Sequence, residues 1–257
     1  PFALGSGLPC WQDSPDNHSD CTPRSDLVRS ACHGHRNFLP SVLHSRDIVT
    51  SGAIGVLQAI HVDFYFASDQ GPRKGTRNPG DPPIDWGTYQ MSVHPSGKDG
   101  GVGMEPMGEL KIEGIYPLAY IRMLTGVEVQ RVFARTTAHF HQLHADNDVE
   151  DLATVTLEME HGIVGSLCIG RTGQATHPSG GEIKIHVLGS QGGLVVNEGS
   201  PTIAMYYRDQ PTNENRQIKV NSNYDFLLME NFAQAIDFDN DTVLDARAGR
   251  SIAATVQ

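Results

Sequence analysis

The amino-acid sequence predicts an α+β fold in which helices pack on one face of a large, mostly antiparallel open sheet. Two observations lead to this prediction. Beyond residue 126, short segments with strand patterns follow one another and are separated by glycine-containing turns, which is typical of antiparallel strands. Helical patterns lie before and after this succession, and such segregation favours an α+β arrangement over an alternating α/β one.

The first expected elements follow an irregular N-terminal arm, residues 1–35, which has no helical or strand periodicity. A helix is predicted over Pro40–Gly52, because proline favours the first turn of a helix and glycine its C-terminus. A strand is predicted over Gly55–Ala67, where alternate residues are apolar. The polar residues 68–103 are predicted to form a long loop, and loops of that length are often functional.

A second helix is expected over Met107–Leu124, with Gly114 and Pro117 either kinking it or separating its first turn. Two further helices are expected near the end of the chain, at Tyr224–Asp237 and from about Asp245 onward. Between these helices lie the predicted strands: Val127–His139, Glu150–Glu160, Ile163–Arg171, Glu182–Leu188, Gly193–Asn197, Thr202–Tyr207 and Gln217–Val220.

Composition and charge exclude several classes of function. The formal net charge is -11 and no stretch is strongly basic, which argues against a nucleic-acid partner because phosphate contacts dominate such binding. The apolar runs are far shorter than the roughly 20 residues of a membrane span. The first residues lack the pattern of a secretion signal, so we expect a cytoplasmic protein.

Two groups of residues resemble metal ligands, and the sequence favours no metal at either. The N-terminal group lacks the close pairs of ligands that zinc sites usually have. The second group is either a metal cluster, completed by Asp146 or Asp148, or an ordinary histidine-rich strand end. The groups are Cys10, Cys21 and Cys32 with His18, His33 and His35, and then His139, His141 and His144.

A series of short motifs occurs in a recognisable order from Arg36 onward. Arg36–Pro40 enters a helix that ends in Ser51–Gly55, and a glycine-rich run then leads into Gly114-Ile-Tyr116. The later motifs are Leu124–Gly126, Val149–Asp151, Gly170–Thr172, Thr176–Gly181, Leu188–Gly192 and Asn231–Ile236. This order resembles the C-terminal domain of the Gfo/Idh/MocA oxidoreductases, in the glucose-fructose oxidoreductase-like branch, and the resemblance covers residues 36–257.

The resemblance implies a substrate-binding and oligomerisation domain of an oxidoreductase that uses NAD or NADP and acts on a sugar or polyol. Apolar or small residues at alternate outward positions of several strands also lead us to expect a homo-oligomer formed through the sheet face. The chain has no complete Rossmann domain and no dinucleotide fingerprint: Gly5-Ser-Gly7 follows no strand and lacks a third glycine. It also lacks the family's Glu-Lys-Pro motif. The residues that would bind a cofactor are therefore unknown, and we expect no redox activity from this chain alone.

The resemblance also implies the residues of the site. Tyr116 and His177 are the candidate catalytic residues, and Arg36, Glu113 and Arg171 are the candidate substrate-binding residues. A tyrosine hydroxyl can give a proton to a carbonyl oxygen, arginine can bind hydroxyls or a carboxylate, and histidine can exchange protons. The alternative for Tyr116 is a tyrosine packed on its helix with the hydroxyl bonded to backbone.

Two positions depart from the family pattern and keep other functions open. The family places carboxylates where this chain has Ile112 and Ala119, which favours a non-redox binding or scaffold module as the alternative. A cofactor-free lyase or isomerase derived from this domain is a further alternative. Of the three glutamates at helical spacing, Glu105 and Glu109 are predicted to be solvated, and Glu113 to contact the substrate.

Overall fold

A computed structural model describes residues 35–66, 71–93, 105–173, 181–197, 202–208, 214–217, 224–238 and 240–257. The strands of these segments form one sheet in the order β2-β3-β4-β1-β5-β6-β7-β8. The strands are β1 (Leu57–Phe66), β2 (Val129–Thr137), β3 (Leu152–Met159), β4 (Val164–Arg171), β5 (Gly181–Gly189), β6 (Gly192–Asn197), β7 (Thr202–Tyr207) and β8 (Glu214–Gln217). The predicted mostly antiparallel open sheet is confirmed.

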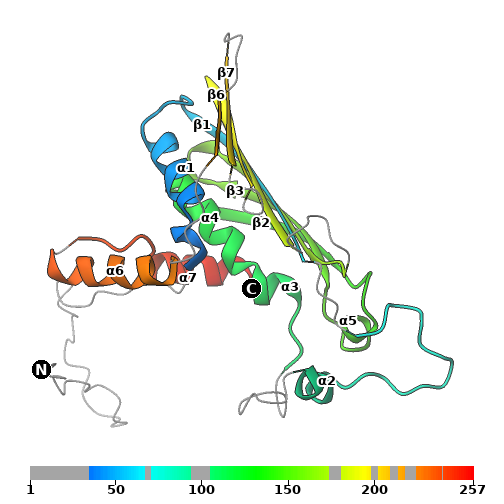
Figure 1. The fold of residues 1–257 in the computed structure, drawn as a ribbon. Helices are drawn as coiled ribbons and strands as arrows, with labels where there is room; N and C mark the ends of the chain where they lie inside the picture. The colour runs from blue at the N-terminus through cyan, green and yellow to red at the C-terminus, as the bar shows by residue number, and fades with distance from the viewer. Residues whose placement is uncertain are drawn as a thin grey trace, which may run out of the picture.

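Helices α1, α3, α4 and α7 pack against the sheet, and Figure 1 shows α1 and α4 on one side of it. The helices are α1 (Pro40–Thr50), α2 (Trp86–Val93), α3 (Glu109–Glu113), α4 (Ile115–Thr125), α5 (Gln142–Asp146), α6 (Tyr224–Asp237) and α7 (Ala246–Thr255), with 3-10 turns η1 (His35–Phe38) and η2 (Glu160–Gly162). The described helices include none that is long and apolar enough to cross a membrane.

The strand β1 joins two antiparallel halves of the sheet. It pairs in parallel with β4 on one side and antiparallel with β5 on the other, whereas the remaining neighbours pair antiparallel. Two meanders, β2–β4 and β5–β8, therefore lie side by side with β1 between them. The C-terminal ends of β1 and β4 lie side by side at one end of the sheet, because Phe66 pairs with Arg171.

The core lies between the sheet and the helices. Along β3 every second residue is buried, and these residues face the same side as the buried residues of β1 and β4. Helix α4 contributes Tyr120, Ile121 and Leu124, each no more than 1% exposed. Each large apolar side chain so buried contributes roughly 1.5–3 kcal/mol to folding, which is why this face fixes the position of α4.

The predicted helix Met107–Leu124 is two helices, α3 and α4, that meet at Gly114. A Cβ atom at Gly114 would lie 2.2 Å from the carbonyl oxygen of Leu110, so only glycine fits this bend. Pro117 lies in the first turn of α4, where its missing N–H removes no helical hydrogen bond. The two helices thereby place Glu113 and Tyr116 on either side of the bend.

Three local elements differ from the sequence predictions. The long loop 68–103 contains the short helix α2, and α5 follows β2 where no helix was expected. The last strand lies at Glu214–Gln217, earlier than the predicted Gln217–Val220. Helices as short as α2 and α5 show too few turns for a helical period, and Trp86 of α2 is fixed by tertiary burial at 3% exposure. Residues 1–34 of the predicted arm lie outside the described residues.

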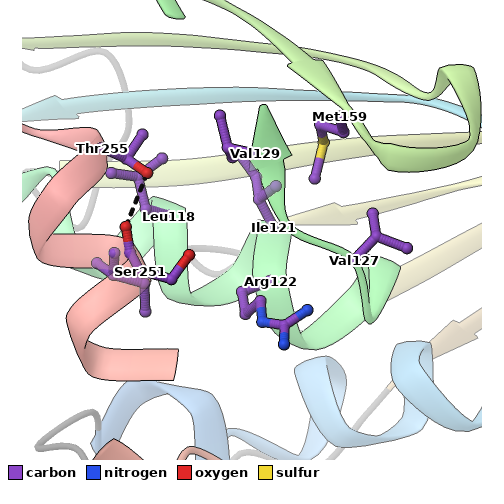
Figure 2. A pocket seen from close by; sticks show the side chains of 9 residues that line it. Leu118, Ile121, Arg122, Val127, Val129, Met159, Ser251 and Thr255 are labelled. Atoms are coloured by element: carbon purple, nitrogen blue, oxygen red, sulfur yellow. Dashed lines mark hydrogen bonds between the residues drawn. The ribbon is translucent and has the colours of Figure 1, made fainter. Parts of the chain in front are cut away.

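Helix α7 packs against α4 and the edge strand β2, and a narrow crevice lies between these elements (Figure 2). The crevice volume is about 10 Å³, enough for no more than a water molecule. At its rim Arg122 lies 2.7 Å from Glu128, which also accepts a hydrogen bond from Ser251. The Thr255 hydroxyl donates to the carbonyl oxygen of Ser251 at 2.9 Å. The side chains are closely packed here, and the crevice is too small to be a ligand site.

Candidate functional site

The bend at Gly114 brings Tyr116 next to Arg36, which lies in the turn before α1. The guanidinium carbon of Arg36 is 5.2 Å from the centre of the Tyr116 ring and 5.7 Å from that of Phe64 on β1. Both distances are typical of cation–π contacts. One arginine therefore contacts aromatic rings of both α4 and β1.

At the end of β4, Arg171 connects the sheet to α3. Its Nε donates to Glu109 Oε1 at 2.6 Å and its Nη2 to Glu109 Oε2 at 3.1 Å, which is a bidentate pair. Nη2 also lies 3.6 Å from Glu113 Oε1. The guanidinium carbon is 5.0 Å from the ring of Phe66, and that ring lies 4.1 Å from the Phe64 ring.

Four of the five predicted site residues therefore lie together. Arg36, Glu113, Tyr116 and Arg171 surround the α3–α4 bend and the ends of β1 and β4, and we refer to them as the bend cluster. The fifth, His177, lies outside the described residues. A role of these residues in substrate binding or catalysis stays a prediction.

The two glutamates of α3 lie in different environments. Glu105 is exposed as expected, but the prediction that Glu109 is solvated is wrong, because its side chain is 0% exposed against β3 and β4. Burial alone would raise the pKa of Glu109, but His144 and Arg171 beside it lower the pKa below its usual value. Burial raises the pKa of Glu113, and the negative charge of Glu109 adds to this effect, while Arg171 and Arg36 oppose it.

A second buried group lies beyond Glu109, in the segment after β2. His141 and His144 are both 0% exposed, and His144 Nε2 lies 3.4 Å from Glu109 Oε1. The expected strand-end arrangement is wrong, because β2 ends at Thr137 and His141 begins the turn of α5. Asp146, one of the ligands considered from the sequence, instead pairs with Arg77 at 3.0 Å.

Asp151 organises this segment. Its carboxylate accepts hydrogen bonds from the backbone N–H groups of His139 at 2.8 Å, Phe140 at 2.7 Å and His141 at 2.8 Å. Burial raises the pKa of Asp151, but His141 and these three donors lower it overall. The sequence singled out Asp151 only as part of a motif before a strand, and its contacts with His141 could not be read from local spacing.

Comparison with known proteins was made at the level of sequence and of fold. Residues 108–195 match the family model described as the GFO/IDH/MocA C-terminal domain. The resemblance to this family is confirmed. Comparison with curated proteins finds no similar sequence.

Solved structures share the fold of this chain at low sequence identity. A levoglucosan dehydrogenase in complex with NADH and L-sorbose is 16% identical, with a TM-score of 0.64 over 88% of this chain and 61% of that one. An inositol dehydrogenase homolog from Azotobacter vinelandii, complexed with NADH and myo-inositol, is 16% identical, with a TM-score of 0.62 over 86% and 59%.

An oxidoreductase from Agrobacterium radiobacter, in complex with NAD+, L-tartaric acid and magnesium, is 15% identical, with a TM-score of 0.63 over 87% of this chain and 59% of that one. The chain thus spans about three fifths of the length of these structures. At these identities the likeness establishes the fold, and the nucleotide and sugar complexes belong to the other proteins.

Proposed function

We propose that residues 36–257 form the substrate-binding and oligomerisation domain of an NAD(P)-dependent oxidoreductase that acts on a sugar or polyol. The observation that carries this proposal is the bend cluster, where Arg36, Glu113, Tyr116 and Arg171 converge from distant parts of the chain. The substrate class is supported by two proteins of the same fold, one complexed with myo-inositol and one with L-sorbose.

The bend cluster has the groups that a polyol needs. Hydroxyls both donate and accept hydrogen bonds, so the Glu113 carboxylate can accept from one hydroxyl while the guanidinium of Arg171 donates to its neighbour. The Tyr116 hydroxyl can give a proton to, or take one from, an oxygen of the substrate. Arg36 keeps the Tyr116 ring in place through the cation–π contact at 5.2 Å.

A nicotinamide cofactor would accept the hydride from a polyol, or supply it in the reverse reduction, but the residues of this chain do not fit it. No Gly-x-Gly-x-x-Gly turn occurs in the sequence to hold the pyrophosphate at a helix N-terminus. We therefore propose that the 257-residue chain alone does not catalyse redox turnover and that turnover requires a nucleotide-binding domain.

The oligomerisation part of the proposal concerns the open face, which is the sheet surface opposite the helices (Figure 1). Apolar side chains from four strands of this face are exposed to between 44% and 72%: Phe133, Val164, Leu188 and Tyr206. Large exposed apolar side chains on one sheet face favour burial against another surface. We propose that a second copy of the chain covers this face.

Sugar binding tests the proposed function directly. Saturation-transfer NMR with myo-inositol and L-sorbose should detect binding to the purified chain, and both Y116F and E113Q should weaken it. R131Q is the matched control, because Arg131 lies on β2 with 80% of its side chain exposed. Absence of binding, or equal weakening by R131Q, contradicts the substrate assignment and favours the scaffold alternative.

Cofactor binding and catalysis are tested separately. NADH fluorescence should not change when the chain is added, and nicotinamide-dependent turnover at an enzyme-like rate would overturn the proposal that the chain alone is inactive. A sugar that binds and is then converted without NADH would favour the cofactor-free lyase or isomerase.

Sedimentation velocity tests the proposed oligomer. It should show a dimer or larger species that F133S and Y206S dissociate. A monomer at all concentrations contradicts the proposal that a second copy covers the open face.

A further inference from the structure

The buried group beyond α3 has the composition of a metal site. His141, His144 and Asp151 each offer one ligand atom, and these atoms lie within 4.8 Å of one another. All three side chains are 0% exposed. The group lies at the end of the sheet near α5 (Figure 1), and the rings of His144 and of Trp86 on α2 are nearly perpendicular, with centres 5.6 Å apart.

The local structure holds the three side chains in place. His141 precedes α5 and His144 lies three residues later, so the two imidazoles share one side of a helical turn, with ring centres 5.5 Å apart. An ionised carboxylate has about four positions for hydrogen bonds or metal ions. Three on Asp151 are taken by backbone N–H groups, and within the described part of the chain Oδ1 accepts only that of His139. One position on Oδ1 therefore remains for a cation.

His144 supplies an independent observation. Its side chain is completely buried, and among the described residues its Nδ1 has no hydrogen-bond partner. Its Nε2 has only the contact with Glu109 Oε1 at 3.4 Å, which is longer than an ordinary hydrogen bond. Buried polar atoms are nearly always paired, so the unpaired Nδ1 indicates a partner atom that the described residues do not provide.

We propose that His141, His144 and Asp151 bind a divalent transition-metal ion, with zinc the best match to two imidazoles and one carboxylate. This departs from the sequence analysis, which favoured no metal and considered Asp146 or Asp148 as the third ligand. Tetrahedral zinc with bonds of about 2.0–2.2 Å places its ligand atoms about 3.4 Å apart. The ligand atoms, now no more than 4.8 Å apart, would approach one another by up to about 1.4 Å through small rotations of the side chains. A water molecule or Glu109 Oε1 completes the coordination.

The ion would have a structural effect on the neighbouring cluster. It would join the turn of α5 to the start of β3 and hold His144 against Glu109, which in turn pairs with Arg171. The cation would also balance the buried charge of Asp151, whose neighbours given above are neutral backbone donors and His141. The proposal does not depend on the proposed function, because a metal can join these segments whatever the chain binds at the bend cluster.

Zinc binding to the full chain tests this proposal. Calorimetric titration with zinc should use protein stripped with EDTA, in which Cys10, Cys21 and Cys32 are replaced by serine because thiolates bind zinc strongly. We expect one zinc ion per chain and a melting temperature that rises with zinc concentration. H144Q should weaken binding by at least roughly tenfold, as expected for loss of one ligand. Cobalt in place of zinc should give the visible absorption of a tetrahedral site.

Two controls separate this site from other histidines. H139Q changes an exposed histidine of the same segment and H161Q one in the turn after β3, and neither should alter zinc affinity. Should H144Q fail to fold, zinc-dependent protection from hydrogen exchange in the serine background locates the ion without substitution at the site. Protection concentrated in residues 139–151 supports the proposal. No binding, protection confined to other segments, or equal affinity of H144Q and H139Q overturns it.

Discussion

Glu109 and Glu113 lie one helical turn apart on α3, yet their carboxylates behave in opposite ways. Glu109 is completely buried, and Arg171 and His144 lower its pKa. Glu113 has 21% of its side chain exposed, and its pKa is raised. The difference shows that burial alone does not decide the charge of a carboxylate. What decides it is how many donors and cations meet the buried oxygens, and Glu109 has the bidentate partner that Glu113 lacks.

The largest effect is expected from breaking the buried pair. Glu109→Ala leaves the guanidinium of Arg171 without its bidentate partner in a buried site, which should lower the free energy of unfolding by about 3–5 kcal/mol. Urea denaturation measures this value. Glu105→Ala is the matched control, because Glu105 is exposed and should change stability by less than about 0.5 kcal/mol. Equal effects of the two substitutions would show that the pair does not stabilise α3.

A somewhat smaller loss is expected at Asp151. Asp151→Asn keeps the shape but removes the charge and replaces one acceptor oxygen by an N–H₂ group, so at least one of the three backbone donors loses its partner. We expect a loss of about 2–3 kcal/mol in metal-free buffer. Hydrogen exchange should also become faster at Phe140 and His141 than elsewhere. Unchanged exchange there would mean that Asp151 does not hold the segment.

These contrasts explain how much of the molecule could be predicted from sequence. The alternation of β3 and the bend at Gly114 are local signals, and both predictions are confirmed. The burial of Glu109 depends on Arg171, which lies 62 residues along the chain, so helical spacing alone wrongly suggested a solvated side chain. The convergence of His144 with Glu109 depends in the same way on the pairing of β2, β3 and β4.

The pH dependence of stability should sharpen the comparison. The lowered pKa of Glu109 gives stability that is present above the ordinary glutamate value, about 4.3, and is lost as the pH falls through the lower folded value. Glu113 has the opposite sign, since its raised pKa makes the ionised form unfavourable once the pH exceeds the folded value. E113Q should therefore be more stable than the natural chain at pH 7–8, and the gain should disappear below about pH 4.

Urea denaturation of E113Q and of the natural chain between pH 3 and 8 checks this prediction. Glu158→Gln in the F133S/Y206S background is the matched control, because the side chain of Glu158 is 62% exposed in the single chain. The stability change that it causes should depend little on pH in the same range. A stability difference between E113Q and the natural chain that is the same at pH 4 and pH 8 would contradict the opposite signs of the two α3 carboxylates.

The smallest effect is expected from breaking an arginine–glutamate pair that is exposed to solvent. Arg131 and Glu158 are 3.3 Å apart on β2 and β3, but their side chains are 80% and 62% exposed. In the F133S/Y206S background, where a second copy should not cover the open face, solvent screens their attraction and holding two long side chains in one geometry costs entropy. R131Q should therefore lower the free energy of unfolding in that background by about 0.5 kcal/mol or less. Because R131Q and Glu109→Ala each break an arginine–glutamate pair, the ratio of their effects measures what burial and bidentate geometry add. A loss above about 2 kcal/mol from R131Q in that background would contradict a solvent-exposed pair, because an ion pair contributes that much only when it is desolvated.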